Sequence, residues 1–286
     1  MAANSTLHPV LTERVLSRLG FDRAPEPTHA GLSALYSQWC DRVPFDNLRK
    51  LIHVRAGKAG PFPGTTAEDY FTAWLAHGTG GTCWSGAGAL HSLLKTLGFD
   101  AVRAIGTMLV APELPPNHGS VRVTFEQTHY LVDTSILHGE PLRLETGTET
   151  QVAHPAWGVR CSRREDRWHI QWRPLHKPDG FECRFERFDS HPAEYADFYE
   201  RTRGWSPFNY EVTARKNRSD SVVGLAFGHA VELRADGSVA SEPITHAERQ
   251  LRLIEVMGYS EEIVHQLPED VPTPPPPGSR TAQASE

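Results

Sequence analysis

The stretch GGTCWSGAGALHSLLKTLG, residues 80–98, places a cysteine at the start of an apolar helix. A helix N-terminus favours a thiolate over a thiol, and the two glycines before Cys83 allow a tight turn with backbone N–H groups free for an oxyanion. Gly98 is a stop signal for the helix. The stretch predicts a nucleophile turn at Cys83; the alternative is a small buried residue that opens a core helix. The apolar positions that continue this helix are Leu90, Leu93, Leu94 and Leu97.

Further helices are expected before this stretch. Apolar residues at helical spacing predict one helix around residues 10–19 and a second after the possible cap Thr28. The segment VPFDNL, residues 43–48, follows the second helix. Thr66 is the expected cap of a third helix, which ends at Gly78. The first third of the chain is therefore predicted to consist of packed helices.

The pattern changes from Phe99 onward to short alternating or β-branched runs separated by Pro, Gly, Asn and Asp. These runs predict a β-sheet or barrel in the middle of the chain. A helix is expected within residues 191–204, and strands with a turn at Asp236 and Gly237 follow it. A final helix starts with a capping box at Thr245 and Glu248.

The composition is that of an ordinary soluble globular protein. Of the 286 residues, 39% are hydrophobic and 22% charged, and no apolar run is long enough to span a membrane. A net charge of -6 and a pI near 6.2 give no reason to expect nucleic acid or an anionic membrane as a partner. The N-terminus does not read as a secretory signal, so we expect a cytoplasmic protein.

The four cysteines are widely scattered and include no CxxC pair. Neither a disulfide framework nor a structural zinc site is therefore expected. Cys40 lies late in a predicted helix, while Cys161 and Cys183 lie in strand-like runs, so these three are interpreted as core or surface residues.

A cysteine nucleophile needs an imidazole to take its proton and a carboxylate or amide to orient that ring. His118 begins a strand-like run, and Asp133 ends the next one, in a predicted hairpin that would bring the two side chains together. A metal site is not predicted, because neither HExxH nor a helical i, i+4 histidine pair is present. The competing candidates are His129, His138, Asp46 and Glu126.

These residues, in this order, resemble the arylamine N-acetyltransferases, over roughly residues 8–265. Residues 43–48 are similar to the family's Ile-Pro-Phe-Glu-Asn-Leu segment. Residues 80–83 are similar to its Arg-Gly-Gly-aromatic-Cys turn. His118 matches the family's catalytic histidine, and Asp133 matches the aspartate that opens its Asp-Val-Gly-Phe-Gly segment.

The resemblance implies an α+β fold related to papain-like cysteine proteases and transglutaminases. We expect a helical bundle with the nucleophile helix over residues 1–98, a β-barrel over 99–200 and an α/β lid over 201–266. Residues 267–286 are rich in proline and poor in apolar side chains, and predict a disordered tail.

The implied activity is ping-pong acyl transfer through a Cys83, His118 and Asp133 triad, without a metal. The implied co-substrate is acyl-CoA, acetyl-CoA in the simplest case, and the acceptor is a small-molecule amine. The expected substrate-binding residues are Phe45, Gly81, Trp84, Ser206 and Phe208.

Several positions depart from the family pattern. Thr79 stands where arginine is usual, Ser85 where glutamate is usual, and residues 134–137 (TSIL) replace Val-Gly-Phe-Gly. We expect these positions beside the nucleophile and in the acceptor pocket, which leaves the substrates open. One alternative is an amide synthase of natural-product biosynthesis that uses an acyl carrier protein with a phosphopantetheine thioester. Another is a catalytically silent binding or scaffold protein.

Overall fold

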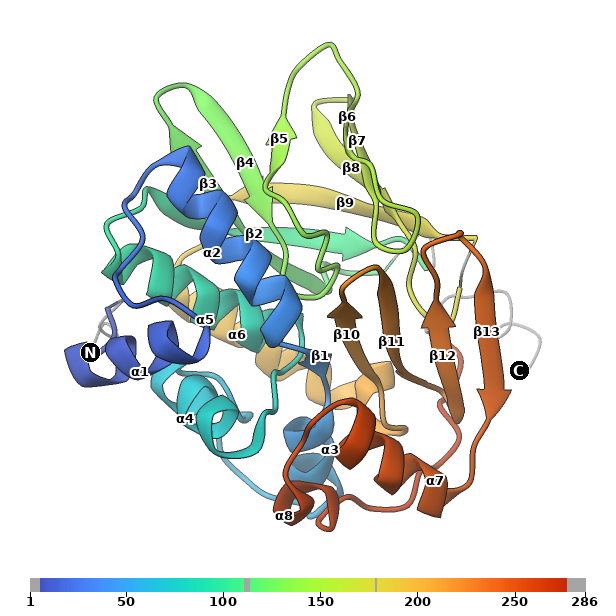
Figure 1. The fold of residues 1–286 in the computed structure, drawn as a ribbon. Helices are drawn as coiled ribbons and strands as arrows, with labels where there is room; N and C mark the ends of the chain where they lie inside the picture. Colours follow the sequence, from blue (N-terminus) through green and yellow to red (C-terminus); the bar gives the residue numbers. More distant parts are fainter. Residues whose placement is uncertain (1–5, 111–113, 178, 277–286) are drawn as a thin grey trace.

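The N-terminal part of the chain is helical (Figure 1). The computed structural model describes residues 6–110, 114–177 and 179–276. Within these ranges, no helix is both long and apolar enough to cross a bilayer. The first helices are α1 (Pro9–Arg18), α2 (His29–Arg42), α3 (Leu48–Arg55), α4 (Ala67–His77) and α5 (Cys83–Thr96).

Local sequence signals set the ends of α4 and the start of α5. The Thr66 side chain accepts a hydrogen bond from the Asp69 backbone N–H, and Gly78 ends α4 in the left-handed region with φ 74°. Both features agree with the sequence prediction. Helix α5 begins at Cys83, and its core-facing leucines are almost fully buried, which contributes about 1.5–3 kcal/mol per side chain.

Eight antiparallel strands form the second part, which lies above the helices in Figure 1. Their order is β5-β4-β3-β2-β9-β8-β7-β6, and the outer strands β5 and β6 lie beside each other, so the sheet curls into a nearly closed barrel. The strands are β2 (Ala101–Met108), β3 (His118–Phe125), β4 (Thr128–Val132), β5 (Leu142–Leu144), β6 (Thr150–Val152), β7 (Val159–Arg164), β8 (Arg167–Trp172) and β9 (Phe181–Phe188).

The third part is a five-stranded sheet with short helices, ordered β1-β10-β11-β12-β13. Its edge strand β1 (Phe45–Asp46) belongs to the N-terminal part, and α3 packs into the same core through Leu48 and Leu51. The lid is thus anchored by residues far away in sequence. Helix α6 (Pro192–Arg201) packs against α5, with Tyr195 and Tyr199 in the core of the helical part. The other elements of the third part are 3-10 turns at Thr202–Gly204 and Pro207–Asn209, β10 (Ala214–Arg218), β11 (Ser221–Ala226), β12 (His229–Leu233), β13 (Val239–Pro243), α7 (His246–Leu251), a π-helical turn at Arg252–Val256 and α8 (Glu261–Val264).

This architecture confirms the predicted fold class of a helical bundle followed by a β-barrel and an α/β lid. The sequence predicts a disordered tail from residue 267, and the structure describes residues 267–276 of it. These residues are extended but held: Asp270 Oδ1 accepts from the Val212 N–H at 2.9 Å, and the Val271 N–H donates to the Tyr210 carbonyl at 3.2 Å. Proline restricts the unfolded chain, so a proline-rich segment loses less entropy when it docks in an extended form. Residues 277–286 lie outside the described ranges.

Candidate active site

The turn that carries Cys83 is held by the segment around Asp46. Asp46 Oδ2 accepts from the Gly80 N–H at 2.6 Å, and the Asp46 N–H donates to the Gly81 carbonyl at 3.2 Å. A Cβ at Gly80 would lie 1.7 Å from the Pro44 carbonyl oxygen, so this close approach requires glycine. Burial raises the pKa of Asp46 to about 6, although hydrogen bonds from Gly80 and Leu48 oppose the rise. Residues 44–46 therefore position the cysteine turn.

The hairpin of β3 and β4 brings His118 and Asp133 together, as predicted. His118 Nε2 donates to Asp133 Oδ2 at 2.6 Å. The two residues are 1% and 0% exposed, so the pair is shielded from water. Since Nε2 faces the carboxylate, Nδ1 is the ring nitrogen left for another partner.

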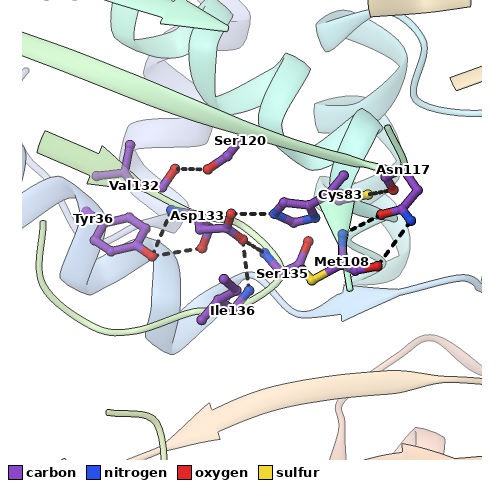
Figure 2. A network of polar contacts seen from close by, with 10 residues as sticks. Tyr36, Cys83, Met108, Asn117, Ser120, Val132, Asp133, Ser135 and Ile136 are labelled. Atoms are coloured by element: carbon purple, nitrogen blue, oxygen red, sulfur yellow. Dashed lines mark hydrogen bonds and ion pairs between the residues drawn. The ribbon is translucent and has the colours of Figure 1, made fainter. Parts of the chain in front are cut away.

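The Asp133 carboxylate is fixed by its own loop and by α2 (Figure 2). Oδ1 accepts from the backbone N–H groups of Ser135 and Ile136, each at 2.9 Å. The Tyr36 hydroxyl donates to the Asp133 carbonyl at 2.8 Å and accepts from the Asp133 N–H at 3.0 Å. The backbone N–H and carbonyl of Asp133 and both of its carboxylate oxygens are therefore hydrogen-bonded. These bonds fix the orientation of the carboxylate toward the imidazole.

The buried pair has strongly shifted pKa values. Burial alone would lower the pKa of His118, but the charge of Asp133 and hydrogen bonds to Asp133 and Cys83 raise it to about 10. Burial would raise the pKa of Asp133, yet His118 and the two loop N–H groups hold it well below its usual range. At neutral pH the pair is therefore an imidazolium and a carboxylate.

Cys83 completes a chain of three side chains. Its contact with the His118 ring is one of the hydrogen bonds that raise the histidine pKa. The Cys83 thiol also donates to the Asn117 carbonyl at 3.8 Å. Asn117 is a residue that sequence reasoning missed; its side chain is held by Met108, whose N–H donates to Asn117 Oδ1 at 2.7 Å. Its position immediately before His118 was the only signal.

The competing histidines and carboxylates have other partners. The ring of His129 bonds to the Thr124 hydroxyl, and that of His138 bonds to the Glu140 carbonyl. Asp46 serves the cysteine turn, and Glu126 lies in the turn between β3 and β4 with φ 54°. Cys40, Cys161 and Cys183 are fully buried, which selects the core from the core-or-surface interpretation of the sequence. Across the described ranges, no group of three His, Cys, Asp or Glu side chains is arranged to hold a metal ion.

A cavity of about 630 Å³ opens beside Cys83 and His118, where the helical part, the barrel and the lid meet. Four of the five predicted substrate-binding residues line it; the fifth, Gly81, lies beside the cavity in a β-bridge with Phe45. The Phe45 and Phe208 rings meet edge to face with centroids 5.3 Å apart. The four lining residues are Phe45, Trp84, Ser206 and Phe208.

The positions that depart from the family pattern lie mostly outside this cavity. Of those six positions, only Ser135 lines it, while Thr79 and Ser85 are buried at 0% and 2% exposure. The Ser85 hydroxyl donates to the Thr82 carbonyl at 3.0 Å. Ser135 is thus the one of these positions at the cavity wall, and a role for the others in the acceptor pocket stays a prediction.

A model of the N-acetyltransferase family matches residues 29–256, most of the chain. The chain therefore belongs to the arylamine N-acetyltransferase family, as the sequence motifs indicated. A curated arylamine N-acetyltransferase of Mycolicibacterium smegmatis is 29% identical over 177 residues, which cover 56% of this chain and 62% of that protein. The match thus spans less than two thirds of that relative.

Solved structures share the fold over nearly the whole chain. The arylamine N-acetyltransferase from Mycobacterium abscessus has a TM-score of 0.74 at 21% identity and covers 90% of this chain and 93% of its own. The enzyme from Salmonella typhimurium has a TM-score of 0.74 at 17% identity, with coverage of 91% and 98%. The Mycobacterium marinum enzyme, solved in complex with CoA, has a TM-score of 0.74 at 23% identity, with coverage of 89% and 93%.

Proposed function

We propose that this protein moves an acyl group from acyl-CoA to a small-molecule amine through an acyl-enzyme on Cys83. The observation that carries the proposal is the buried, charged His118–Asp133 pair in contact with Cys83 at the wall of the cavity. Such a cation beside a sulfur favours the thiolate, which is the reactive nucleophile.

In the first half-reaction, the Cys83 proton resides on His118 and the thiolate attacks the thioester carbonyl. The first N–H groups of α5 have no intrahelical partners, and they would stabilise the oxyanion beside Cys83. The bond from the carbonyl carbon to the CoA sulfur then breaks. CoA leaves as a thiol with the proton from His118.

In the second half-reaction, the amine attacks the acyl-enzyme and His118 takes the amine proton. A carbon–nitrogen bond forms, the carbon–sulfur bond to Cys83 breaks, and the thiolate–imidazolium pair returns. Asp133 keeps the ring in one orientation through both steps. Because one product leaves before the second substrate reacts, the kinetics are ping-pong.

The CoA assignment is supported by the related Mycobacterium marinum enzyme, which is solved with CoA, and by a cavity within the usual range for small-molecule sites. The carrier-protein alternative uses the same thioester chemistry and differs in the donor alone. A cytoplasmic location stays a prediction.

A panel of thioesters tests the function directly. We expect acetyl-CoA to add one acetyl group to the protein, which intact mass measures and peptide mapping places on Cys83, and aniline to remove it as acetanilide. An acyl carrier protein loaded with the same acetyl group is the matched donor. If only the acyl carrier protein acetylated Cys83, the acyl donor would be the carrier protein and not CoA. If no thioester acetylated Cys83, acyl transfer would be contradicted.

The tail offers a second prediction, because residues 273–276 line the cavity. Glu211 Oε2 accepts from the Thr273 N–H at 3.2 Å and holds this segment in place. We expect a chain that ends at Val271 to show a KM for acetyl-CoA raised about 3- to 10-fold over a chain that ends at Pro276. Both keep the Arg249–Asp270 ion pair, so their thermal midpoints should agree. Equal KM values would show that the segment makes no contact with substrate.

A further inference from the structure

Lys50 is a buried lysine at the wall of the cavity that also contains Cys83. It is 3% exposed, and its Nζ donates to the Thr202 hydroxyl at 2.9 Å. Nζ also lies 5.0 Å from the centre of the Phe62 ring. An ammonium has three N–H donors, so Thr202 satisfies only one of them.

Cys83 is the main negative group that acts on Lys50, and no carboxylate of the described residues pairs with it. Burial lowers its pKa to about 7, and the neighbouring charges follow in order: Cys83 raises it, Arg203 lowers it and Glu200 raises it. Glu200 itself pairs with Arg203 at 2.5 Å. In the part of the chain that the structure describes, no carboxylate lies within ion-pair distance of Lys50. A buried ammonium with no carboxylate partner and only one of its three N–H donors bonded favours an anionic ligand beside it.

The cavity as a whole carries an excess of positive charge. Lys50, Lys177 and Arg215 line it, and Arg215 is 4% exposed with a buried Nε that has no partner. Among the described lining residues the sole carboxylate is Glu211, which is engaged by the backbone of Thr273. An anionic ligand is therefore favoured over a neutral or cationic one.

We propose that Lys50 binds a carboxylate of the substrate beside Cys83, so that the enzyme takes a carboxylate-bearing acyl group or a carboxylate-bearing amine. This inference rests on the proposed function and names the substrate class of the same site. The CoA phosphates are a poor match for Lys50, since the pantetheine arm separates them from the thioester that must reach Cys83. The carboxylate instead belongs to the reacting end of the donor or to the acceptor.

Equilibrium binding separates the two sources without requiring transfer. In a Cys83→Ala protein, calorimetry would compare malonyl-CoA with the shape-matched isovaleryl-CoA, and 4-aminobenzoate with 4-aminobenzamide. A hydrogen-bonded charge pair predicts that the carboxylate member of one pair binds about 10- to 100-fold more tightly. The first pair tests the acyl group and the second tests the amine.

Adding Lys50→Met should abolish this preference, because methionine keeps the length of the side chain without its charge. Lys95→Met, which removes an exposed lysine at the end of α5, is the matched control and should leave the preference intact. If Lys50→Met lowers the thermal midpoint, Lys50→Gln replaces it. A preference that survives loss of Lys50, or no preference in either pair, would overturn the proposal while the acyl-transfer panel on the wild type still stands.

Proton uptake gives a readout that a merely structural lysine would not produce. In the protein that keeps Cys83, burial lowers the pKa of Lys50 to about 7 although the Cys83 charge raises it, and a bound carboxylate raises it further. At pH 8 the carboxylate ligand should therefore bind with uptake of a proton, seen as an enthalpy that depends on the buffer. At pH 6 the lysine is already protonated and the uptake should be small. Equal uptake in Lys50→Met would contradict the assignment.

Discussion

Replacing Cys83 by serine is expected to abolish the acetyl adduct and to lower the rate of amine acetylation by about 10⁴- to 10⁶-fold, as for loss of a nucleophile that acts with its base. A serine hydroxyl is far less acidic than a thiol, so the charged His118–Asp133 pair cannot generate the corresponding anion. Intact mass after incubation with acetyl-CoA measures the adduct, and chromatography of acetanilide measures turnover.

Cys161→Ala is the matched control for this prediction. Cys161 is also fully buried, but it lies in the barrel core on β7 and away from the cavity. We expect this variant to keep the adduct at a lower thermal stability. Normal acetylation of Cys83→Ser at another residue would remove Cys83 from the proposed mechanism.

The parts of the site that could be predicted from sequence depend on local patterns. The nucleophile turn follows from glycines placed before a cysteine and an apolar helix, and the structure begins α5 at Cys83. The choice of His118 over His129 and His138 could not be made by spacing. It depends on the β3–β4 register, which pairs Val121 with Val132 and leaves Asp133 just beyond the paired strand, diagonal to His118.

Long-range pairing explains what the sequence did not reveal. Strand β1 is two residues long and pairs Phe45 with Arg215, a partner 170 positions away, so no local pattern indicates it. The following helix α3 is short, and it carries Lys50 into the cavity. Lysines are usually exposed. The burial of Lys50 depends on Thr202, which lies against α3 and is distant in sequence, so the sequence does not reveal it.

The residues at positions 79 and 85, Thr79 and Ser85, suit buried positions because they carry no charge. Both positions are buried, and a charged residue at either would need a partner of opposite sign nearby. By the family resemblance, an arginine and a glutamate are each replaced here by a small polar residue, so neither position holds an unpaired buried charge.

Replacing Asp133 by asparagine is expected to slow acetylation of Cys83 by about 10²- to 10⁴-fold at pH 7. The amide oxygen still accepts from the N–H groups of Ser135 and Ile136, so the loop keeps its hydrogen bonds. The imidazole loses its counter-charge, however, and burial then lowers the pKa of His118 below the value of a free histidine. The ring becomes neutral at pH 7 and no longer stabilises a thiolate. Single-turnover acetylation followed by mass measures the effect.

The same variant has a stability signature whose sign follows from the pKa of His118. In the wild type this pKa is raised to about 10, so the stabilisation from the pair is complete below pH about 6.5 and is lost as pH rises through about 10. The stability of the wild type relative to Asp133→Asn should therefore be greater at pH 6 than above pH 10, by about 3 kcal/mol. Denaturant titrations at pH 6, 8 and 10 measure it.

Ser120→Ala provides the control for this pH dependence. Its hydroxyl donates to the Val132 carbonyl at 3.3 Å in the same hairpin, and it carries no charge. Its loss should cost about 1 kcal/mol at every pH. If Asp133→Asn also shifted stability by a constant amount across this range, His118 and Asp133 would not be a charged pair. The imidazolium that the proposed mechanism needs beside Cys83 would then have no electrostatic support, whatever the loss of rate.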